Sequence, residues 1–334
     1  MAKTVEQISS ALNLSITTVR LVLNGQAERY RISQKTQKKI QDYVNKYGYT
    51  INHIARSLKL NKTETLGLIV PNLSNPFFSS LAESMELSCR SKGYRLMICC
   101  SHNDPEHEKK LLASLEERNV DGIFVVPVTE ETQMYHIKTS NKPIVFLDRD
   151  FAQNASSWVV SDNFESGYAL TSSMFKLIQK PIVFFAGAPI LPPVKERIAG
   201  FISAMVENGI DEKDCEVFYS QTDLVNDGEL LMKEYIETHN DIPQNFIASS
   251  LPILEGIISF LRQHLGYIPD SLNIGAFDEH IMLNFLANNI WSMKQNDKDI
   301  AENAITIMNN KISGEKRSDQ IKIKTEIISR LKKK

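Results

Sequence analysis

Short apolar runs alternate with segments of helical periodicity from Leu66 onward, and this alternation constrains the fold more than any other feature of the chain. The runs include LGLIVP, RLMICC, GIFVVPV, PIVFLD, PIVFFAGA and CEVFYS. Helices are predicted between them, for example at about 77–92 and 106–118. Continuous apolar strands of this kind are buried on both faces, as in parallel sheets covered by helices on either side. The sequence therefore predicts a doubly wound α/β body.

The alternation continues for too long to fit one sheet of usual size, so we predict two lobes. In open α/β sheets, ligands bind at the carboxyl ends of the strands, here in the cleft between the lobes. Polar groups do follow the apolar runs, in the segments PNLSNPFF, FLDRD, SDNF, GAFDEH and SMKQND. Their amides and carboxylates suit sugar hydroxyls, although Asp and Asn at such positions also commonly cap the next helix.

Motifs of catalysis are not evident. No G-x-G-x-x-G follows the first strand, and no G-x-x-x-x-G-K-[ST] occurs in the 334 residues, which disfavours a nucleotide-dependent enzyme. No serine elbow, metal-binding His-Glu pair or spaced acid/base dyad is visible. The sequence therefore predicts a binding protein without enzymatic activity, cofactor or metal.

The cysteines and the lengths of the apolar runs indicate in which cellular compartment the protein works. Cys89, Cys99, Cys100 and Cys215 show no C-x-x-C spacing, and we interpret them as reduced thiols. A metal site that joins His102 to Cys99 and Cys100 is the alternative to buried core thiols. No apolar run reaches the roughly 18 residues of a membrane span, and no secretion signal opens the chain. We expect a cytoplasmic protein with no membrane partner.

Charge separates the beginning of the chain from the rest. Residues 1–64 contain eleven Lys and Arg against four Asp and Glu, a net charge of +7, whereas the whole chain carries −2. A basic head on an acidic body favours a polyanionic partner for the head alone.

Two short helices are predicted within this head. Thr4 and Gln7 form a capping-box pattern ahead of an amphipathic segment. Asn13 tolerates the positive φ that a tight turn needs, and Ser15 is placed to cap the second helix. Such a pair is a helix-turn-helix, whose second helix presents its first residues to the major groove of DNA. Val19, Val22 and Leu23 are expected to face inward, and Ile16, Thr17, Arg20 and Leu21 outward. A third helix is predicted after Ser33, with Ile40 and Val44 inward and Lys35, Lys38 and Lys39 outward.

The order of these parts resembles the LacI/GalR family of transcription regulators over essentially the whole chain. The stretches LVLNG and RYRIS are most similar to the branch of sucrose-operon repressors and the fructose repressor, or catabolite repressor/activator. Asn13 stands where the family usually has Gly. The resemblance implies an all-α helix-turn-helix domain at 1–50 and a hinge helix at 51–63. It also implies an effector-binding and dimerisation domain at 64–330, with one lobe at about 64–162 and 293–322 and the other at about 163–292 and 323–330.

The resemblance also implies two sets of site residues. Leu58 matches the leucine that the family's hinge helix inserts into the minor groove. The predicted DNA-binding residues are Thr4, Ser15, Ile16, Thr17, Thr18, Arg20, Asn24, Arg31, Ser33, Asn52, His53, Ala55, Arg56 and Leu58. Arg197 lies in the family's R-x-x-G-F context, and Ser249-Ser250 replaces its usual Asn-Asp. The predicted effector-binding residues are Asn75, Phe77, Phe78, Asp148, Arg149, Asp162, Arg197, Ser249, Asp278 and Gln295.

These expectations combine into a homodimeric repressor of a sucrose or fructose utilisation operon. It would bind a palindromic operator and be released by a small sugar. A regulator that responds to fructose 1-phosphate is one alternative, in which Arg149, Lys195 and Arg197 converge on the phosphate. The other is a cytosolic sugar-binding protein or enzyme without a DNA function.

Overall fold

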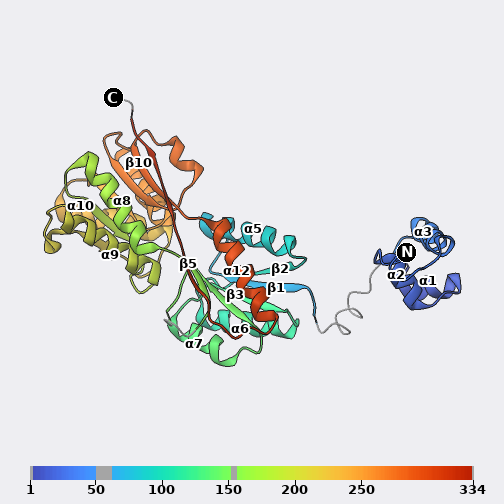
Figure 1. Ribbon diagram of the computed structural model, residues 1–334. Helices are drawn as coiled ribbons and strands as arrows, with labels where there is room; N and C mark the ends of the chain where they lie inside the picture. Colours follow the sequence, from blue (N-terminus) through green and yellow to red (C-terminus); the bar gives the residue numbers. More distant parts are fainter. Residues whose placement is uncertain (1–2, 50–61, 152–155, 333–334) are drawn as a thin grey trace. The chain divides into compact units, whose positions relative to one another are not determined.

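The computed structural model describes residues 3–49, 62–151 and 156–332. The chain divides into two compact units, Met1–Thr63 and Glu64–Lys334 (Figure 1). Most of the predicted hinge lies outside the described residues, including Asn52, His53, Ala55, Arg56 and Leu58. No helix in the described part of the chain is long and apolar enough to cross a membrane.

The N-terminal unit contains the three predicted helices, α1 (Val5–Leu12), α2 (Ile16–Leu23) and α3 (Gln34–Tyr47). Thr4 and Gln7 form the predicted capping box, and Ser15 and Ser33 cap α2 and α3 through their side chains. Asn13 has a φ of 53° and ends α1 in the left-handed conformation, as its place in the turn predicts. The small apolar core consists of Val5, Ile8, Leu12, Val19 and Ile40, with Val22, Leu23 and Val44 packed against it.

The first lobe of the body is built on a six-stranded sheet with the order β11-β5-β4-β3-β1-β2. All of its strand pairs are parallel. The strands are β1 (Thr65–Val70), β2 (Arg95–Cys100), β3 (Gly122–Val125), β4 (Ile144–Leu147), β5 (Trp158–Ser161) and β11 (Gln320–Ile323). Helices α5 (Pro76–Ser91) and α12 (Asp297–Ile312) cover one face, and α6 (Pro105–Glu117) and α7 (Glu130–Thr139) cover the other (Figure 1).

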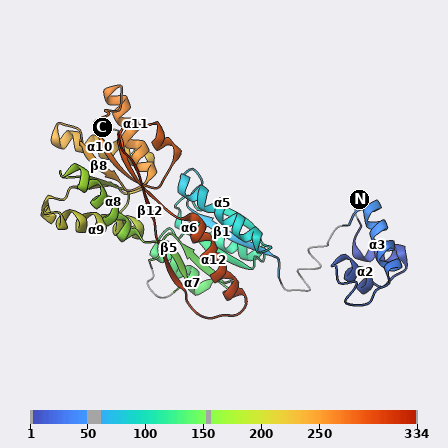
Figure 2. The same ribbon diagram turned by 45° about the horizontal axis from the view of Figure 1, so that its top comes forward.

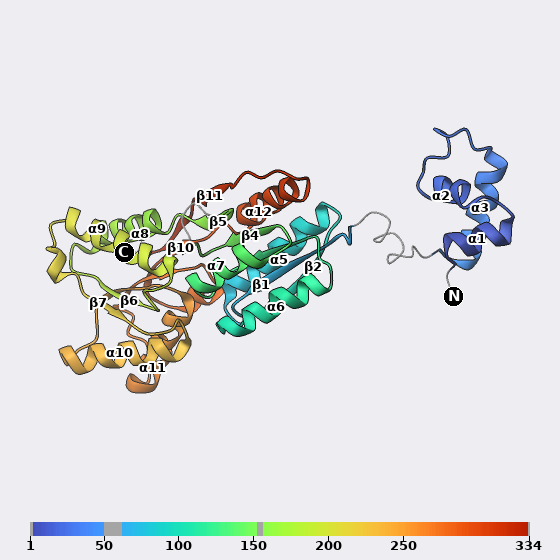
Figure 3. The same cartoon turned by 90° about the horizontal axis from the view of Figure 1, so that it is seen from below.

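The second lobe has a six-stranded sheet with the order β12-β10-β9-β8-β6-β7. Its strands are β6 (Val183–Ala186), β7 (Val217–Tyr219), β8 (Asn245–Ala248), β9 (Asn273–Phe277), β10 (Asn289–Lys294) and β12 (Glu326–Arg330). Helices α8 (Asn163–Ile178) and α9 (Pro192–Glu207) lie on one side, and α10 (Val225–His239) and α11 (Leu251–Leu265) on the other (Figure 3). Two short 3-10 helices, η1 (Glu212–Asp214) and η2 (Ile281–Phe285), complete this lobe. The edge strand β12 pairs antiparallel with β10, which departs from the all-parallel sheet predicted.

The chain passes between the lobes three times, after β5, after β10 and between β11 and β12. Figure 2 shows the C-terminal segment running from α12 past β5 to β12. The expected boundaries near 292 and 322 differ slightly from the strand ends, because β10 continues to Lys294 and β11 to Ile323. Both lobes are thus discontinuous in sequence, and their strand ends face a shared junction.

Helices α8 and α9 cross at a pair of glycines. A side chain at Gly167 would collide with the backbone oxygen of Arg197, and one at Gly200 with that of Phe164. This close approach brings the start of α8 beside the first turns of α9. Arg197 therefore projects toward Asn163 and the carboxyl edge of the second sheet.

Candidate functional site

A small cavity lies between the two lobes at the carboxyl ends of their strands. Its volume is about 40 Å³, well below the several hundred Å³ of typical small-molecule sites. A sugar fits here only if it also occupies the adjoining cavity of about 1060 Å³ or if the lobes move apart, which is the hinge motion typical of two-lobed binding proteins. The polar lining consists of Asn75, Asp148, Arg149, Arg197, Asp223, Ser250, Asp278 and Gln295, with Phe77 and Phe78 as its aromatic part.

Two aspartates occupy equivalent positions at the ends of central strands. Asp148 follows β4 with a φ of 60°, and Asp278 follows β9 with a φ of 70°. The left-handed conformation costs a residue with a side chain about 1–2 kcal/mol, and such strain is commonly retained at ligand sites. Each backbone N–H is held by the neighbouring strand, since Asp148 donates to the oxygen of Val159 and Asp278 to that of Met293, both at 3.1 Å. The backbone of both aspartates is therefore held at the cavity by the neighbouring strands.

Arg197 is the most fully engaged side chain of the cavity. Its Nε donates to Oδ1 of Asn163 at 2.8 Å, and its Nη1 donates to the backbone oxygen of Ser249 at 2.7 Å. Its guanidinium carbon lies 4.4 Å from the centre of the Phe277 ring, a cation–π arrangement. Only 5% of the residue is exposed, so the guanidinium is fixed in orientation.

A hydrogen-bonded chain joins the two lobes beside the cavity. Ser161, in β5 of the first lobe, donates to Oε1 of Gln295 at 2.6 Å. Gln295 in turn donates from Nε2 to Oδ1 of Asp278, also at 2.6 Å. Gln295 lies in the second crossing, between β10 and α12, and its amide bonds to a residue of each lobe.

The charges of the cavity do not balance. Three carboxyls, from Asp148, Asp223 and Asp278, face two guanidinium groups, from Arg149 and Arg197. Burial raises the pKa of each of these three aspartates above its ordinary value, although the arginines act in the opposite direction. Burial also lowers the pKa of Arg149, against the carboxylate of Asp148. The site accordingly favours a ligand that donates hydrogen bonds to carboxyls.

Most of the predicted effector residues lie together at this cavity. Eight of the ten line it, namely Asn75, Phe77, Phe78, Asp148, Arg149, Arg197, Asp278 and Gln295. Asp162 caps α8 and lines a larger adjoining cavity. Ser249 is fully buried, and its hydroxyl accepts a hydrogen bond from the N–H of Gly187 at 2.9 Å. The assignment of these residues to an effector stays a prediction.

Two polar residues of the cavity were not predicted as ligands. Ser250 lines it in place of Ser249 and donates to Oδ1 of Asp223 at 2.7 Å. Asp223 lies in the loop after β7. Ligands of open α/β sheets bind at the carboxyl ends of the strands, so the loop after the apolar run CEVFYS was a place to look for this residue.

The adjoining cavity shares Asp148 and Pro193 with the small one. Trp158 and Phe164 contribute aromatic surface to it, and Lys195 and Lys322 contribute positive charge. Lys195 therefore lines a different cavity from Arg149 and Arg197. Whether the three converge on a phosphate, as that alternative expects, stays a prediction.

The DNA-facing candidates of the N-terminal unit fall into two groups. Ile16, Thr17 and Arg20 are exposed, with Ile16 42% exposed, as expected for groups that contact bases. Others form caps or turns: the Thr18 hydroxyl lies 2.7 Å from that of Ser15, and Thr4 and Ser33 begin helices. Asn24 ends α2, and Arg31 is exposed with a φ of 53°.

The two-lobed body and its interlobe cavity define a ligand-binding protein of the periplasmic-binding-protein type. Residues 66–316 match the family model described as periplasmic binding protein domain, and the chain belongs to this family. The resemblance to LacI/GalR regulators is confirmed, because relatives that match over nine tenths of the chain are regulators of this kind.

Two curated relatives illustrate the similarity. The catabolite repressor/activator of Salmonella typhimurium is 28% identical over 305 residues, which cover 91% of this chain and 90% of the relative. The sucrose operon repressor of Klebsiella pneumoniae is 25% identical over 312 residues, or 93% of each chain.

Solved structures show the same fold. The Cra transcriptional dual regulator of Pseudomonas putida, in complex with fructose 1-phosphate, has a TM-score of 0.72 at 24% identity and covers 81% of this chain and all of its own. The lac repressor dimer bound to operator and the anti-inducer ONPF has a TM-score of 0.83 at 13% identity and covers 98% of both chains.

Proposed function

We infer that this chain is a sugar-responsive transcription repressor of a sucrose or fructose utilisation operon. A homodimer binds a palindromic operator, and a small sugar in the interlobe cavity releases it. The observation that carries this inference is the interlobe cavity, where charged and amide groups from both lobes meet at strand ends. Because the ligand contacts both lobes in this proposal, its binding favours one angle between them and is coupled to the body's conformation.

The N-terminal unit supports the DNA-binding part of the proposal. The exposed Ile16 is suited to apolar contact with a thymine methyl group. The Thr17 hydroxyl can form a hydrogen bond with more than one type of base. Arg20 is placed for a guanine or a phosphate. One such helix reads one half-site, so a dimer and a palindrome supply the affinity that one head lacks. Residues 51–63 transmit the lobe movement to the heads in this proposal.

The charge of the cavity favours a neutral sugar as the effector. A phosphate dianion would join three buried carboxyls whose pKa values are already raised by burial, and two guanidinium groups do not offset that charge. Sugar hydroxyls instead donate to carboxyls and accept from Arg197 and Gln295. The aromatic pair Phe77 and Phe78, 5.1 Å between ring centres, suits the apolar side of a sugar ring.

Fructose 1-phosphate is the second candidate, and one observation favours it. Lys195 and Lys322 line the adjoining cavity, where Nζ of Lys322 lies 3.8 Å from Oε1 of Glu196, so a phosphate of a sugar in the small cavity reaches toward Lys195. The complex of the Pseudomonas putida regulator with that ligand makes it the phosphate to test.

The decisive experiment measures operator binding and sugar response together. Fluorescence anisotropy with the promoter DNA beside the chain's own gene is recorded at low and moderate salt, with sucrose, fructose or fructose 1-phosphate added. We expect salt-dependent binding that one of these sugars weakens by about tenfold or more. No binding at low salt would contradict the DNA-binding proposal, and binding that no sugar affects would contradict the effector proposal. Turnover of a sugar by the pure protein would instead support an enzyme.

A further inference from the structure

The buried face of α7 is unusual because its fully buried side chains are all polar. Thr132, Gln133 and His136 are each 0% exposed. Burying polar groups is costly unless each finds a hydrogen-bond partner. A helix on the surface of a sheet ordinarily buries aliphatic side chains. The partners of these three residues therefore indicate what the helix does.

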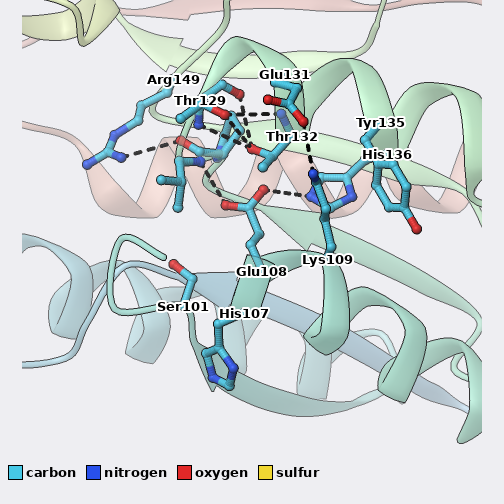
Figure 4. Close-up of polar contacts among 12 residues, drawn as sticks. Ser101, His107, Glu108, Lys109, Thr129, Glu131, Thr132, Tyr135, His136 and Arg149 are labelled. Carbon is cyan, nitrogen blue, oxygen red and sulfur yellow. Dashed lines mark hydrogen bonds and ion pairs between the residues drawn. The ribbon is translucent and has the colours of Figure 1, made fainter. Parts of the chain in front are cut away.

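His136 leads to the cavity through one buried carboxylate. Its Nε2 lies 2.6 Å from Oε1 of Glu108, which is also 0% exposed and comes from α6. The other oxygen of Glu108 accepts a hydrogen bond from the backbone N–H of Val128 at 2.7 Å. Figure 4 shows His136 and Glu108 side by side beneath the segment that precedes α7.

The chain of contacts continues through a single peptide group. The carbonyl of Pro127 and the N–H of Val128 belong to the same planar unit. On its carbonyl side, this unit accepts a hydrogen bond from Nη1 of Arg149 at 3.3 Å, and Arg149 lines the cavity. Hydrogen bonds in a row polarise one another in a low dielectric. The Glu108 carboxylate consequently strengthens the carbonyl that holds the guanidinium.

The geometry also assigns the proton on the imidazole. Within the described residues, Nδ1 of His136 has no hydrogen-bond partner, although it is buried. A buried N–H without an acceptor is rarer than an unpaired acceptor. Nε2 therefore carries the hydrogen and donates it to Glu108, which leaves the carboxylate free to accept from Val128.

Gln133 holds the residues that follow Arg149. Its Nε2 donates to Oδ1 of Asp150 at 2.6 Å, and its Oε1 accepts from the N–H of Phe151 at 2.7 Å. Gln133 thus bonds to the two residues that follow Arg149 in the chain, whereas His136 acts through Glu108 on the Pro127–Val128 peptide that accepts from the Arg149 guanidinium. The carboxylate of Glu108 also opposes the lowering of the Arg149 pKa that burial causes.

We propose that Glu108 and His136 are positioning residues of the effector cavity, which hold Arg149 in place through the Pro127–Val128 peptide and so set sugar affinity without touching the sugar. This inference rests on the proposed function. Its distinguishing consequence is energetic coupling between Glu108 and Arg149, which are linked by hydrogen bonds through that peptide and by the attraction between their charges.

The test is a double-mutant cycle with Glu108→Gln and Arg149→Met in the full chain. Calorimetry measures the affinity for sucrose, fructose and fructose 1-phosphate. Gln at 108 keeps the shape, removes the charge and turns one of the two accepting oxygens into a donor, so we expect affinity about tenfold weaker, and no further loss from Glu108→Gln once Arg149 is methionine. Glu117→Gln, an exposed position on the same helix, is the control and should bind as the wild type does.

His136 provides an independent arm. His136→Gln retains a donor for Glu108 and should bind within about twofold of the wild type, whereas His136→Leu should match Glu108→Gln. Wild-type affinity in Glu108→Gln, or an equal loss in the Arg149→Met background, would overturn the proposal. If the wild type binds none of the three sugars, the proposed effector fails. In that case the free energy of unfolding of the ligand-free protein is measured for the same four proteins. A coupling energy of zero between the two substitutions would overturn the positioning role.

Discussion

Arg197→Lys is the substitution that most directly measures how the cavity is held together. The guanidinium makes two hydrogen bonds in different directions, to Asn163 and to the backbone of Ser249, and stacks on Phe277. A lysine ammonium has no planar fork and no second nitrogen. It can replace one of these contacts but leaves another buried acceptor unpaired.

The magnitude follows from those contacts. An unpaired buried acceptor costs about 1–3 kcal/mol, and a weakened cation–π contact costs about 0.5–1 kcal/mol. We therefore expect the free energy of unfolding to fall by about 2–3 kcal/mol. For a domain of this size, each kcal/mol corresponds to roughly 2–4 °C in Tm, so the variant should melt about 6 °C lower.

Thermal unfolding with and without sugar is the assay. A sugar at about a hundred times its Kd stabilises the wild type by about 2.7 kcal/mol, and this increase should disappear in Arg197→Lys. Arg262→Lys, at an exposed position on α11, is the control. A variant that melts as the wild type does, or that keeps the full sugar response, would refute the role of the fork.

Three further predictions concern the head and the cavity charge. Thr17→Ala or Arg20→Ala should weaken or redirect operator binding by about 1–3 kcal/mol per lost base contact, and equal sugar affinity in calorimetry is the control. Asn13→Ala should destabilise the N-terminal unit by about 1–2 kcal/mol because of the positive φ, whereas Asn13→Gly should not; equal melting of the two by circular dichroism would refute this account. Asp223→Asn should raise Tm at neutral pH, since burial raises the pKa of this carboxyl and its ionised form destabilises the fold. That gain should shrink as pH falls through the raised pKa, where the wild-type carboxyl takes up its proton, so a gain independent of pH in melts at several pH values would contradict it.

The local structure was predictable where a backbone conformation or a helix end favours a few residue types. Asn13 in a left-handed turn, and Ser15 and Ser33 as helix caps, follow from short-range chemistry, and each is confirmed. The apolar runs likewise predicted the central strands. The antiparallel β12 was not predicted, because strand direction at a sheet edge depends on where the chain crosses between lobes.

The candidate site was predictable to the level of strand ends but not to single side chains. Ser249 and Ser250 are neighbours, and successive side chains at a strand end point in different directions. One therefore bonds to the backbone of Gly187 and the other lines the cavity. The burial of Glu108 and His136 depends on how α6 and α7 pack, which neither segment reveals alone.

The three crossings between the lobes also constrain how this protein can be made. The core of the first lobe includes Ile300, Ala304 and Met308 of α12 and Ile323 of β11, more than 130 residues after the last of its other strands, β5. As the ribosome synthesises the chain, β1 to β5 emerge long before the helix that covers them. The second lobe likewise waits for β12. Both lobes therefore complete folding almost together, once the segment from α12 to β12 has been synthesised, and until then each exposes apolar surface that a chaperone can bind.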